Sequence, residues 1–377
     1  MHVVNPSPRV RASPYFDATV SEGVSSFTSY NQMLLPTSYG DPEGEYWRLI
    51  NGVSMWDVAA QRQVQLSGTD ASHLAQILTV RDLTELSVGR AKYAPICNHS
   101  GTLINDPVGN RVDENLYWFS IADSNILLFA RAIAAERNLN VEVTEPDVSP
   151  LAIQGPKAVN VVSAIFGEWV RNLRHFEIRN TSIEGIPVLV SRSGWSKQGG
   201  FELYLQDSSK GLNLWNLVRE AGQPWDIKPG TPNHSERIES GLLSVGTDTD
   251  DSTNPFEVRL GDFVNLDLPE SVIGVSALRH IKQNGVKRQQ LGIRFSADLP
   301  KLLNRNWFEI RNGKDRVGHI TSLCFSYRLE CNIGLALVRS TLHPGDEVTV
   351  RIDEDNHHSG TLVNLPFVKK AISKQQT

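Results

Sequence analysis

The sequence is poor in cysteine and has no long apolar segment. Its three cysteines, Cys97, Cys324 and Cys331, are odd in number, and no pair has the spacing of zinc ligands. We therefore expect reduced thiols in a cytoplasmic protein rather than a disulfide framework or a zinc site. No segment approaches the roughly 20 apolar residues of a membrane helix. The first sixteen residues lack the apolar core of a signal peptide.

The sequence also lacks an excess of positive charge. Its formal net charge is −5, with 37 Lys and Arg against 42 Asp and Glu. A mildly acidic surface argues against nucleic acid and against an anionic membrane as the main partner. The composition of the 377 residues, 40% hydrophobic and 21% charged, is that of a globular protein with two or three cores. We therefore expect small molecules as ligands.

Common catalytic and nucleotide-binding motifs are missing as well. The sequence has no Walker loop, no GxGxxG after a strand, no HExxH and no GxSxG. The glycine-rich stretch from Gly194 to Gly200 lacks the Gly-Lys-Ser/Thr ending that grips phosphates. These absences disfavour NTPases, dinucleotide-dependent enzymes, zinc proteases and serine hydrolases.

The pattern of hydrophobic residues predicts an α+β protein. The first 25 residues or so, rich in Pro and Ser, are expected to form an extended arm. The expected helices are 41–51, 71–78 after an Asp70 cap, 124–137 capped by Asp123 or Ser124, 158–166 and 211–222. From Lys287 onwards, short alternating strands separated only by turns predict a small antiparallel barrel or sandwich. The expected domains are 1–146 and 147–286, both mixed α/β, and 287–377, all β.

Three polar segments are candidates for a functional site. The loop in SGWSKQGGFELY, from Ser193 to Tyr204, offers Trp195 to a cation and Lys197 to a carboxylate. Glu202 and Tyr204 lie two apart on the following strand and share one face. The same composition also fits an ordinary hairpin with a solvated loop and a solvated strand face.

The other two segments carry Asp106 and Arg237. In GTLINDP an Asp followed by Pro interrupts the strand pattern, and such a local conflict marks either a functional position or a strand-end turn. Arg237 in NHSERIESG could reach a carboxylate of a ligand, although a solvated helix face is the simpler interpretation. Arg237 and Glu239 are two apart on the predicted helix and need not pair.

Several long strings in these segments resemble the aminomethyltransferase (glycine cleavage T protein) superfamily. Within it the chain is similar to the branch of dimethylsulfoniopropionate demethylases, and the resemblance covers nearly the whole length. The strings include YNQMLLP (30–36), NDPV (105–108), LAIQGP (151–156), RSGWSKQGGFELY (192–204) and ERIESGLLS (236–244). The resemblance implies two mixed α/β subdomains around a central tetrahydrofolate channel, followed by a C-terminal antiparallel β-barrel.

The resemblance also implies roles for individual residues. It places the cofactor tetrahydrofolate against Glu202, Tyr204, Arg237 and Tyr93. It places catalysis at Asn105 and Asp106, where Asp106 either orients N5 of the folate or relays its proton. Trp195, Lys197, Tyr30 and Gln32 are implied to bind the substrate. The glycine cleavage proteins typically carry two adjacent Asp at the 105–106 position, so Asn105 favours a demethylase. Gln32 replaces a His of the demethylases, and the strand containing Tyr93 also differs, so both departures bear on the substrate.

The implied reaction is methyl transfer from the sulfonium of dimethylsulfoniopropionate to N5 of tetrahydrofolate. Because the leaving group is a neutral thioether, alignment and desolvation suffice, in agreement with the missing catalytic motifs. Three alternatives remain. One is a folate-dependent demethylase of a betaine, dimethylglycine or a methoxy aromatic. The others are an aminomethyltransferase with a lipoyl carrier partner and a non-catalytic folate-binding protein. A homodimer would rest on family analogy alone.

Overall fold

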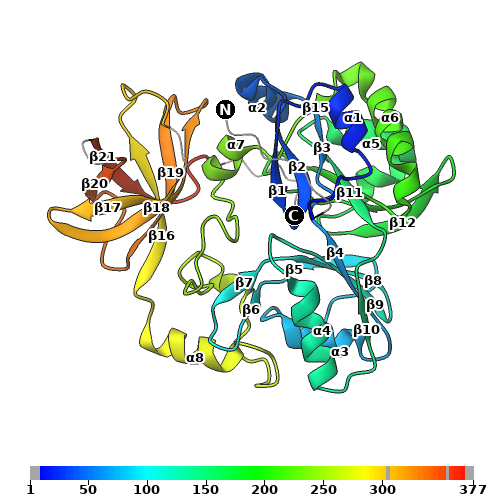
Figure 1. Cartoon of the computed structure of the whole chain (residues 1–377), viewed down its shortest axis with the longest axis horizontal. Coiled ribbons are helices and arrows are strands. Elements are labelled where there is room, and N and C mark those ends of the chain that lie inside the picture. The colour runs from blue at the N-terminus through cyan, green and yellow to red at the C-terminus, as the bar shows by residue number, and fades with distance from the viewer. Residues whose placement is uncertain (1–8, 303–305, 354–355, 370–377) are drawn as a thin grey trace.

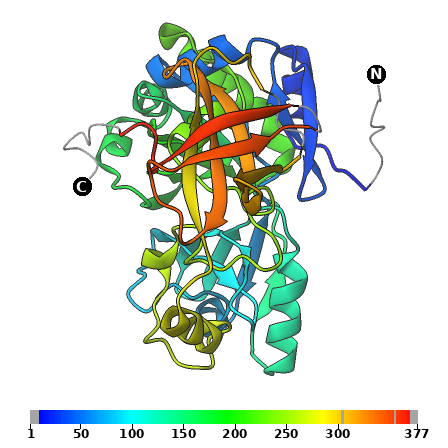
Figure 2. The ribbon, with the colours of Figure 1, turned by 90° about the vertical axis from the view of Figure 1, so that its left-hand side faces the viewer.

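The computed structural model describes residues 9–302, 306–353 and 356–369. The chain forms three lobes (Figure 1), with a barrel on the left and two sheet-containing lobes at the upper and lower right. The short helix α7 (His234–Glu239) lies between the barrel and the upper lobe. Turning the molecule brings the barrel in front of the other two lobes (Figure 2).

The upper lobe is a six-stranded sheet of order β12-β13-β14-β11-β3-β15. Its strands are β3 (Ser54–Asp57), β11 (Ser149–Gln154), β12 (Ile178–Ile183), β13 (Ile186–Ser191), β14 (Gly200–Leu205) and β15 (Lys228–Pro229). Helices α1 (Phe16–Ser21), α5 (Ala158–Phe166) and α6 (Gly211–Gly222) cover one face and form a hydrophobic core with it. Helix α2 (Pro42–Asn51) and the hairpin β1 (Ser26–Tyr30) and β2 (Met33–Ser38) precede the sheet.

The lower lobe is a five-stranded sheet of order β10-β4-β9-β8-β5. Its strands are β4 (Gln63–Ser67), β5 (Arg90–Tyr93), β8 (Val108–Asp113), β9 (Leu116–Ser120) and β10 (Glu142–Thr144). Helices α3 (Ala71–Leu78) and α4 (Ile126–Glu136) bury their apolar sides against its outer face. A small ladder of β6 (Ile96–Cys97) and β7 (Leu103–Asn105) adjoins it, and α8 (Val275–Asn284) follows later in the chain.

The C-terminal lobe is a closed antiparallel barrel of order β16-β19-β18-β17-β20-β21. Its strands are β16 (Arg288–Phe295), β17 (Phe308–Asn312), β18 (Asp315–Ser326), β19 (Cys331–Arg339), β20 (Glu347–Arg351) and β21 (His357–Val363). The inward residues of these strands form a separate core. The alternating pattern therefore produced a barrel, as expected, and its first strand begins one residue after the predicted start at Lys287.

The predicted helices are present, with differences at their ends. The N-terminal segment is not wholly extended, because residues 16–21 form α1. Asp70 makes no capping bond and instead accepts from the Asn140 backbone, while α4 is capped by Asn125 rather than Asp123 or Ser124. The first eight residues of the expected arm and the last eight of the expected third domain lie outside the described residues.

The division of the chain at 146/147 stays a prediction. The upper sheet contains residues from both sides of this boundary. Strand β3, which belongs to the first expected domain, pairs there with β11, which belongs to the second. In the described ranges, no helix is both long and apolar enough to cross a lipid bilayer.

Candidate functional site

The two sheets face each other through a layer that contains many polar side chains. In β14, Phe201, Leu203 and Leu205 point into the helix-covered core, so Glu202 and Tyr204 point the other way. Tyr204 joins a cluster with Trp118 of β9, which places the lower sheet opposite this face. The shared face that the sequence predicted for Glu202 and Tyr204 is therefore directed between the lobes and is not solvated.

Glu202 is a buried carboxylate with no basic partner in the described ranges. Its Oε2 accepts from the Ser193 hydroxyl at 2.5 Å and lies 3.3 Å from the Tyr204 hydroxyl. Burial raises the pKa of Glu202, and these two hydrogen bonds counteract the rise. Because no hydrogen bond to Oε1 is found among the described residues, this oxygen is available to a ligand that carries N–H groups.

Two amide oxygens of the lower sheet are buried without a hydrogen-bond partner in the described part of the chain. They are Oε1 of Gln63 on β4 and Oδ1 of Asn110 on β8. Asn110 and Ser120 both lower the pKa of Tyr204 as hydrogen-bond partners, so the Asn110 side chain reaches the Glu202 face. Buried acceptors normally find donors, because an unpaired one costs about 1–3 kcal/mol. The layer therefore suits a flat ligand rich in N–H donors.

Asp106 follows β7 and contacts Tyr93 on β5. Its Oδ2 accepts from the Tyr93 hydroxyl at 2.7 Å. Burial raises the pKa of Asp106 to about 7, the Tyr93 bond lowers it, and the charge of Asp248 adds a smaller rise. The structure thus brings Asp106 together with Tyr93, and a carboxyl group of this pKa can exchange a proton near neutral pH.

Asn105, beside Asp106, has its side chain committed to the protein. Its Nδ2 donates to the Ala122 carbonyl at 2.9 Å and to Ser124 Oγ at 2.8 Å, and its Oδ1 accepts from the Ala122 N–H at 3.0 Å. Asn105 is fully buried. The side chain thus fixes the end of β7 against the segment after β9, and the catalytic role expected for Asn105 stays a prediction.

Arg237 on α7 is buried and multiply bonded. Its Nη1 contacts Asp248 Oδ2 at 2.9 Å and its Nη2 donates to Ser322 Oγ at 2.6 Å. Asp248 also accepts from Thr321 at 2.7 Å and from the Ser244 N–H at 2.9 Å. The pair therefore joins α7, the segment after it and strand β18 of the barrel. The Arg237 side chain is therefore buried and does not lie on a solvated helix face, which was the simpler interpretation of the sequence. Contact between Arg237 and the cofactor stays a prediction.

We expect Arg237→Ala to lower the free energy of unfolding by about 3–5 kcal/mol, because the substitution leaves Asp248 buried and without its partner. Urea denaturation followed by fluorescence measures the change. Arg316→Ala, at an exposed arginine of β18, is the control and should change stability by less than about 0.5 kcal/mol. A loss below 1 kcal/mol for Arg237→Ala would mean that the pair is not a structural link.

The loop between β13 and β14 is anchored at both ends. Ser196 Oγ donates to Gln154 Oε1 at 2.8 Å, and Glu236 Oε1 accepts from the Lys197 N–H at 3.0 Å and from Gln198 Nε2 at 2.8 Å. Gly194 has a φ of 151°, which residues with a side chain rarely adopt, and a Cβ atom at that position would stand 2.0 Å from the Gln154 amide. The loop is therefore held in place by contacts with β11 and α7.

Within this loop Trp195 is partly buried and Lys197 is exposed. The guanidinium carbon of Arg237 lies 5.8 Å from the centre of the Trp195 ring. The Trp195 ring thus already lies near one cation. Lys197 contributes to lowering the pKa of His175, which places its charge toward His175.

Tyr30 and Gln32 belong to the tight turn between β1 and β2. Asn31 and Gln32 have φ values of 49° and 60°, as expected for the two central residues of a type I′ hairpin turn. Burial raises the pKa of Tyr30, and the charges of Asp106 and Asp123 raise it further, so Tyr30 lies within electrostatic range of Asp106. Gln32 is exposed at the tip. Tyr30 is therefore brought to Asp106, whereas Gln32 points to solvent.

The sequence did not single out Ser193, Asn110, Gln63 or Asp248. Ser193 and Asp248 lie outside any periodic pattern, in a loop and in an irregular segment. For Gln63 a signal existed, because it begins the alternation of polar and apolar residues Gln63-Val64-Gln65-Leu66, whereas Asn110 lies between Gly109 and Arg111 and has no such signal. Such a pattern normally indicates a solvated face, and only the opposing sheet turns this face into a buried layer.

Comparisons with known proteins agree over most of the chain. The GCVT N-terminal domain family matches residues 16–268, and the glycine cleavage T-protein C-terminal barrel domain family matches residues 288–369. Dimethylsulfoniopropionate demethylase from Ruegeria pomeroyi is 38% identical over 93% of this chain and 95% of its own length. An aminomethyltransferase from Symbiobacterium thermophilum is 30% identical over 81% of this chain and 83% of its own length.

A solved structure confirms the fold. The glycine cleavage system aminomethyltransferase T from Bartonella henselae superposes with a TM-score of 0.83, covering 95% of this chain and 98% of that one at 19% identity. Both family matches and the relative at 38% identity give one assignment. The chain belongs to the glycine cleavage T-protein (aminomethyltransferase) family.

Proposed function

We propose that the chain is a tetrahydrofolate-dependent demethylase. It transfers a methyl group from dimethylsulfoniopropionate to N5 of tetrahydrofolate, giving methylmercaptopropionate and 5-methyltetrahydrofolate. The observation that carries the proposal is the 38% identity to the demethylase over nearly the full length, against 26–30% for the aminomethyltransferases. Because function resides in sites rather than in folds, the residues of the site must also fit.

The polar layer between the sheets fits a reduced pterin. A pterin ring is flat and carries several N–H donors, and Glu202, Asn110 and Gln63 offer buried acceptors to such donors. When bound, tetrahydrofolate supplies N5, the nucleophile that receives the methyl group. In this proposal Glu202 holds the pterin, and Tyr204 and Tyr93 line the same channel.

The methyl donor is a zwitterion with a sulfonium at one end and a carboxylate at the other. In this proposal Trp195 offers a ring face to the sulfonium, and Lys197 attracts the carboxylate. In the reaction the new N–C bond forms as the C–S bond breaks, and the bonding pair stays on the neutral sulfur. No acid is needed for the leaving group, so the protein's main tasks are to orient the two reactants and exclude water.

Asp106 would manage the proton that accompanies methylation. The methylated amine formed by transfer must lose one proton, and a carboxylate with a pKa near 7 can accept it at neutral pH. The Tyr93 hydroxyl holds Asp106 Oδ2 in place. In this proposal Tyr30, whose pKa is raised in part by the charge of Asp106, lies on the side of the methyl donor.

The direct test is anaerobic incubation with dimethylsulfoniopropionate and tetrahydrofolate, with both products measured by mass spectrometry. Equal amounts of methylmercaptopropionate and 5-methyltetrahydrofolate are expected. Folate binding without turnover of this donor would reject the proposed substrate. A panel of glycine betaine, dimethylglycine and a methoxy aromatic would then identify another donor, and transfer from an aminomethyl-lipoyl carrier would indicate an aminomethyltransferase. Binding without any turnover would indicate a folate-binding protein.

Trp195→Ala is expected to raise KM for dimethylsulfoniopropionate about tenfold, with a small effect on kcat. The substitution removes a cation–π contact worth about 1–2 kcal/mol in a desolvated site. Steady-state kinetics at saturating tetrahydrofolate measure the change. Trp307→Ala, at a half-exposed tryptophan of the barrel, is the control. An unaltered KM would move the donor pocket away from the 193–199 loop.

We further propose that the protein acts in the cytoplasm on small molecules. Its three cysteines are buried and unpaired, which suits a reducing compartment. A homodimer is proposed on family analogy alone, and light scattering of the purified chain would test it. A monomer at micromolar concentration would reject the dimer.

A further inference from the structure

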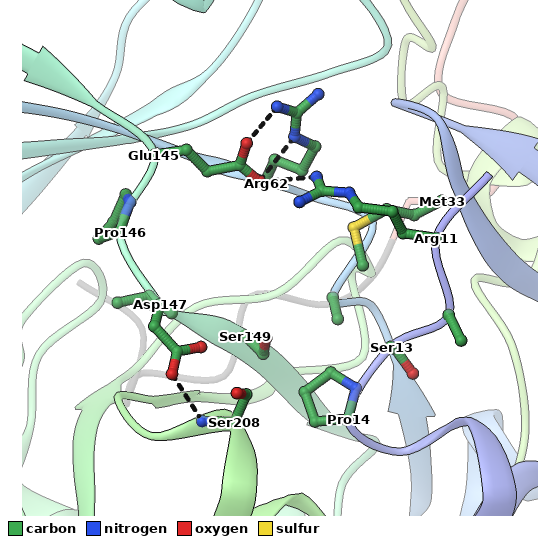
Figure 3. Close-up of a pocket in the computed structure, with 13 residues that line it drawn as sticks. Arg11, Ser13, Pro14, Met33, Arg62, Glu145, Pro146, Asp147, Ser149 and Ser208 are labelled. Atoms are coloured by element: carbon green, nitrogen blue, oxygen red, sulfur yellow. Dashed lines mark hydrogen bonds and ion pairs between the residues drawn. The ribbon is translucent and has the colours of Figure 1, made fainter. Parts of the chain in front are cut away.

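A cavity of about 560 Å³ is lined by residues other than those of the polar layer described above (Figure 3). It is enclosed by the segment before α1, by the β1–β2 hairpin, and by the segment from Glu145 to Ser149. None of its lining residues is among the ten site residues expected from the sequence. Its volume falls within the range of small-molecule sites, which is about 300–1,000 Å³.

One side of the cavity carries a net positive charge. Arg62 Nε and Arg11 Nη2 both contact Glu145 Oε1, at 2.9 and 2.7 Å, and Arg62 Nη2 contacts Glu145 Oε2. Two guanidinium groups therefore share one carboxylate. Arg62 is largely buried, whereas the Arg11 side chain is 47% exposed and, in the described chain, contacts Glu145 alone. Arg11 consequently retains N–H donors for a bound carboxylate.

The opposite side carries negative charge. Figure 3 shows Asp147 across the cavity from the arginines, where its Oδ2 accepts from the Ser208 backbone N–H at 3.0 Å. Behind the lining residue Ser13, the buried Asp57 accepts from the Ser13 hydroxyl. Burial raises the pKa of Tyr15, and the charges of Asp57 and Asp147 raise it further, so both carboxylates act on the region around Tyr15. Neither carboxylate forms an ion pair with a described residue.

We propose that this cavity is a second binding site, which takes a small zwitterion. The carboxylate of the ligand would bind Arg11 beside Arg62, and its methylated cationic end would lie near Asp147. Met33, Pro14 and Pro146 line the cavity and supply apolar contacts for methyl groups. Opposite charges on opposite walls select a ligand that carries both signs over an anion or a cation alone.

The site adjoins the predicted donor site across one turn of chain. Met33 lines the cavity, and Arg62 Nη1 donates to the Asn31 carbonyl at 3.4 Å. The Asn31 backbone N–H donates to Asp123 Oδ1 at 2.7 Å, and the neighbouring Tyr30 lies within electrostatic range of Asp106. A zwitterion in the cavity would therefore contact the turn that presents Tyr30. This inference goes beyond the proposed function, and it rests on the charges of the cavity alone.

Calorimetric titration of the full chain with 3-(trimethylammonio)propionate tests the proposal. We expect at least one binding equivalent that persists in Trp195→Ala. In Arg11→Gln and in Asp147→Asn the dissociation constant of that equivalent should rise about tenfold or more. Arg316→Gln and Asp315→Asn, which change exposed charges on the barrel, should leave it unchanged. Thermal melting of each variant controls for folding, since Arg11 and Asp147 are both exposed.

Several results would overturn the proposal. It fails if the wild type binds no zwitterion, or if Arg11→Gln and Asp147→Asn retain every equivalent. It also fails if propionate or choline alone binds as tightly as the zwitterion, because the site would then recognise only one of the two charges of the ligand. Loss of binding in Trp195→Ala alone would assign the ligand to the donor site. Methyl transfer is assayed separately, so this inference and the proposed function can fail independently.

Discussion

Replacing Glu202 with alanine is expected to weaken tetrahydrofolate binding about 100-fold. Glu202 is the buried carboxylate of the polar layer, and hydrogen bonds from Ser193 and Tyr204 converge on its Oε2. Its Oε1 remains for the ligand. A hydrogen bond to a charged group contributes about 1.5–3 kcal/mol, and two such bonds to a pterin account for a change of this size. Fluorescence titration with tetrahydrofolate under anaerobic conditions measures it.

Two further variants make the result specific. Glu202→Gln keeps the shape of the side chain but places an NH2 group where one acceptor stood, so most of the affinity should be lost here too. Glu220→Ala, at an exposed glutamate of α6, should bind folate like the wild type. If Glu202→Ala retains wild-type affinity while remaining folded, the pterin does not bind at this face of β14.

Strand periodicity allowed the most reliable predictions. The alternation of FELYL placed Glu202 and Tyr204 on one face, and the hydrogen bond between them is consistent with that placement. The short alternating strands after Lys287 predicted the barrel, because each strand buries every second residue in its core. An alternating pattern determines which residues share a face of the strand. Tertiary contacts determine whether the polar face lies against solvent or against another part of the protein.

Burial of polar residues could not be predicted in the same way. Helix α7 is short and polar, and by pattern it would be solvated, yet Glu236, Arg237 and Glu239 are all buried. Each charge has partners from a distant part of the chain: Arg237 binds Asp248, and Glu239 binds Arg328 of the barrel. Arg237 and Glu239 do not pair with one another, as their spacing predicted. Polar residues on a short helix are usually exposed, but those of α7 are buried because other parts of the chain surround it. A local stretch of sequence does not show which distant segments will pack against a helix.

The residues of the candidate site also differ in how far the sequence could predict them. Tyr93, Asp106 and Tyr30 come together although they lie on β5, after β7 and on β1, and only the family resemblance could associate them before the fold was known. Asn105 illustrates the opposite case. Asn105 lies beside Asp106 in the motif, yet its side chain forms three hydrogen bonds that fix the local structure. The sequence alone does not distinguish such a structural residue from one that takes part in the reaction.

Activity is expected to rise with pH through about 7 and to lose this dependence in Asp106→Asn. Burial raises the pKa of Asp106 to about 7, so the carboxylate that accepts the proton is formed only above that pH. In the wild type, kcat/KM should increase about tenfold per pH unit below 7 and level off above it. Loss of a general base typically costs 10²–10⁴-fold, so Asp106→Asn should lower the plateau by at least about 100-fold. Rates between pH 5.5 and 8.5 measure both effects.

The raised pKa of Asp106 also predicts that its contribution to the free energy of unfolding depends on pH. A residue that affected catalysis alone would show no such dependence. A carboxyl group whose pKa is about 7 when folded and 3.8 when unfolded binds its proton more tightly in the folded state. Its contribution to stability is present below pH 3.8 and is lost as the pH rises through 7. Relative to wild type, Asp106→Asn should therefore gain stability between pH 5 and 8 in urea denaturation. Tyr93→Phe removes the hydrogen bond that favours the carboxylate and should shift the activity profile to higher pH. An unshifted profile in Tyr93→Phe together with a pH-independent rate in the wild type would mean that Asp106 only orients the folate.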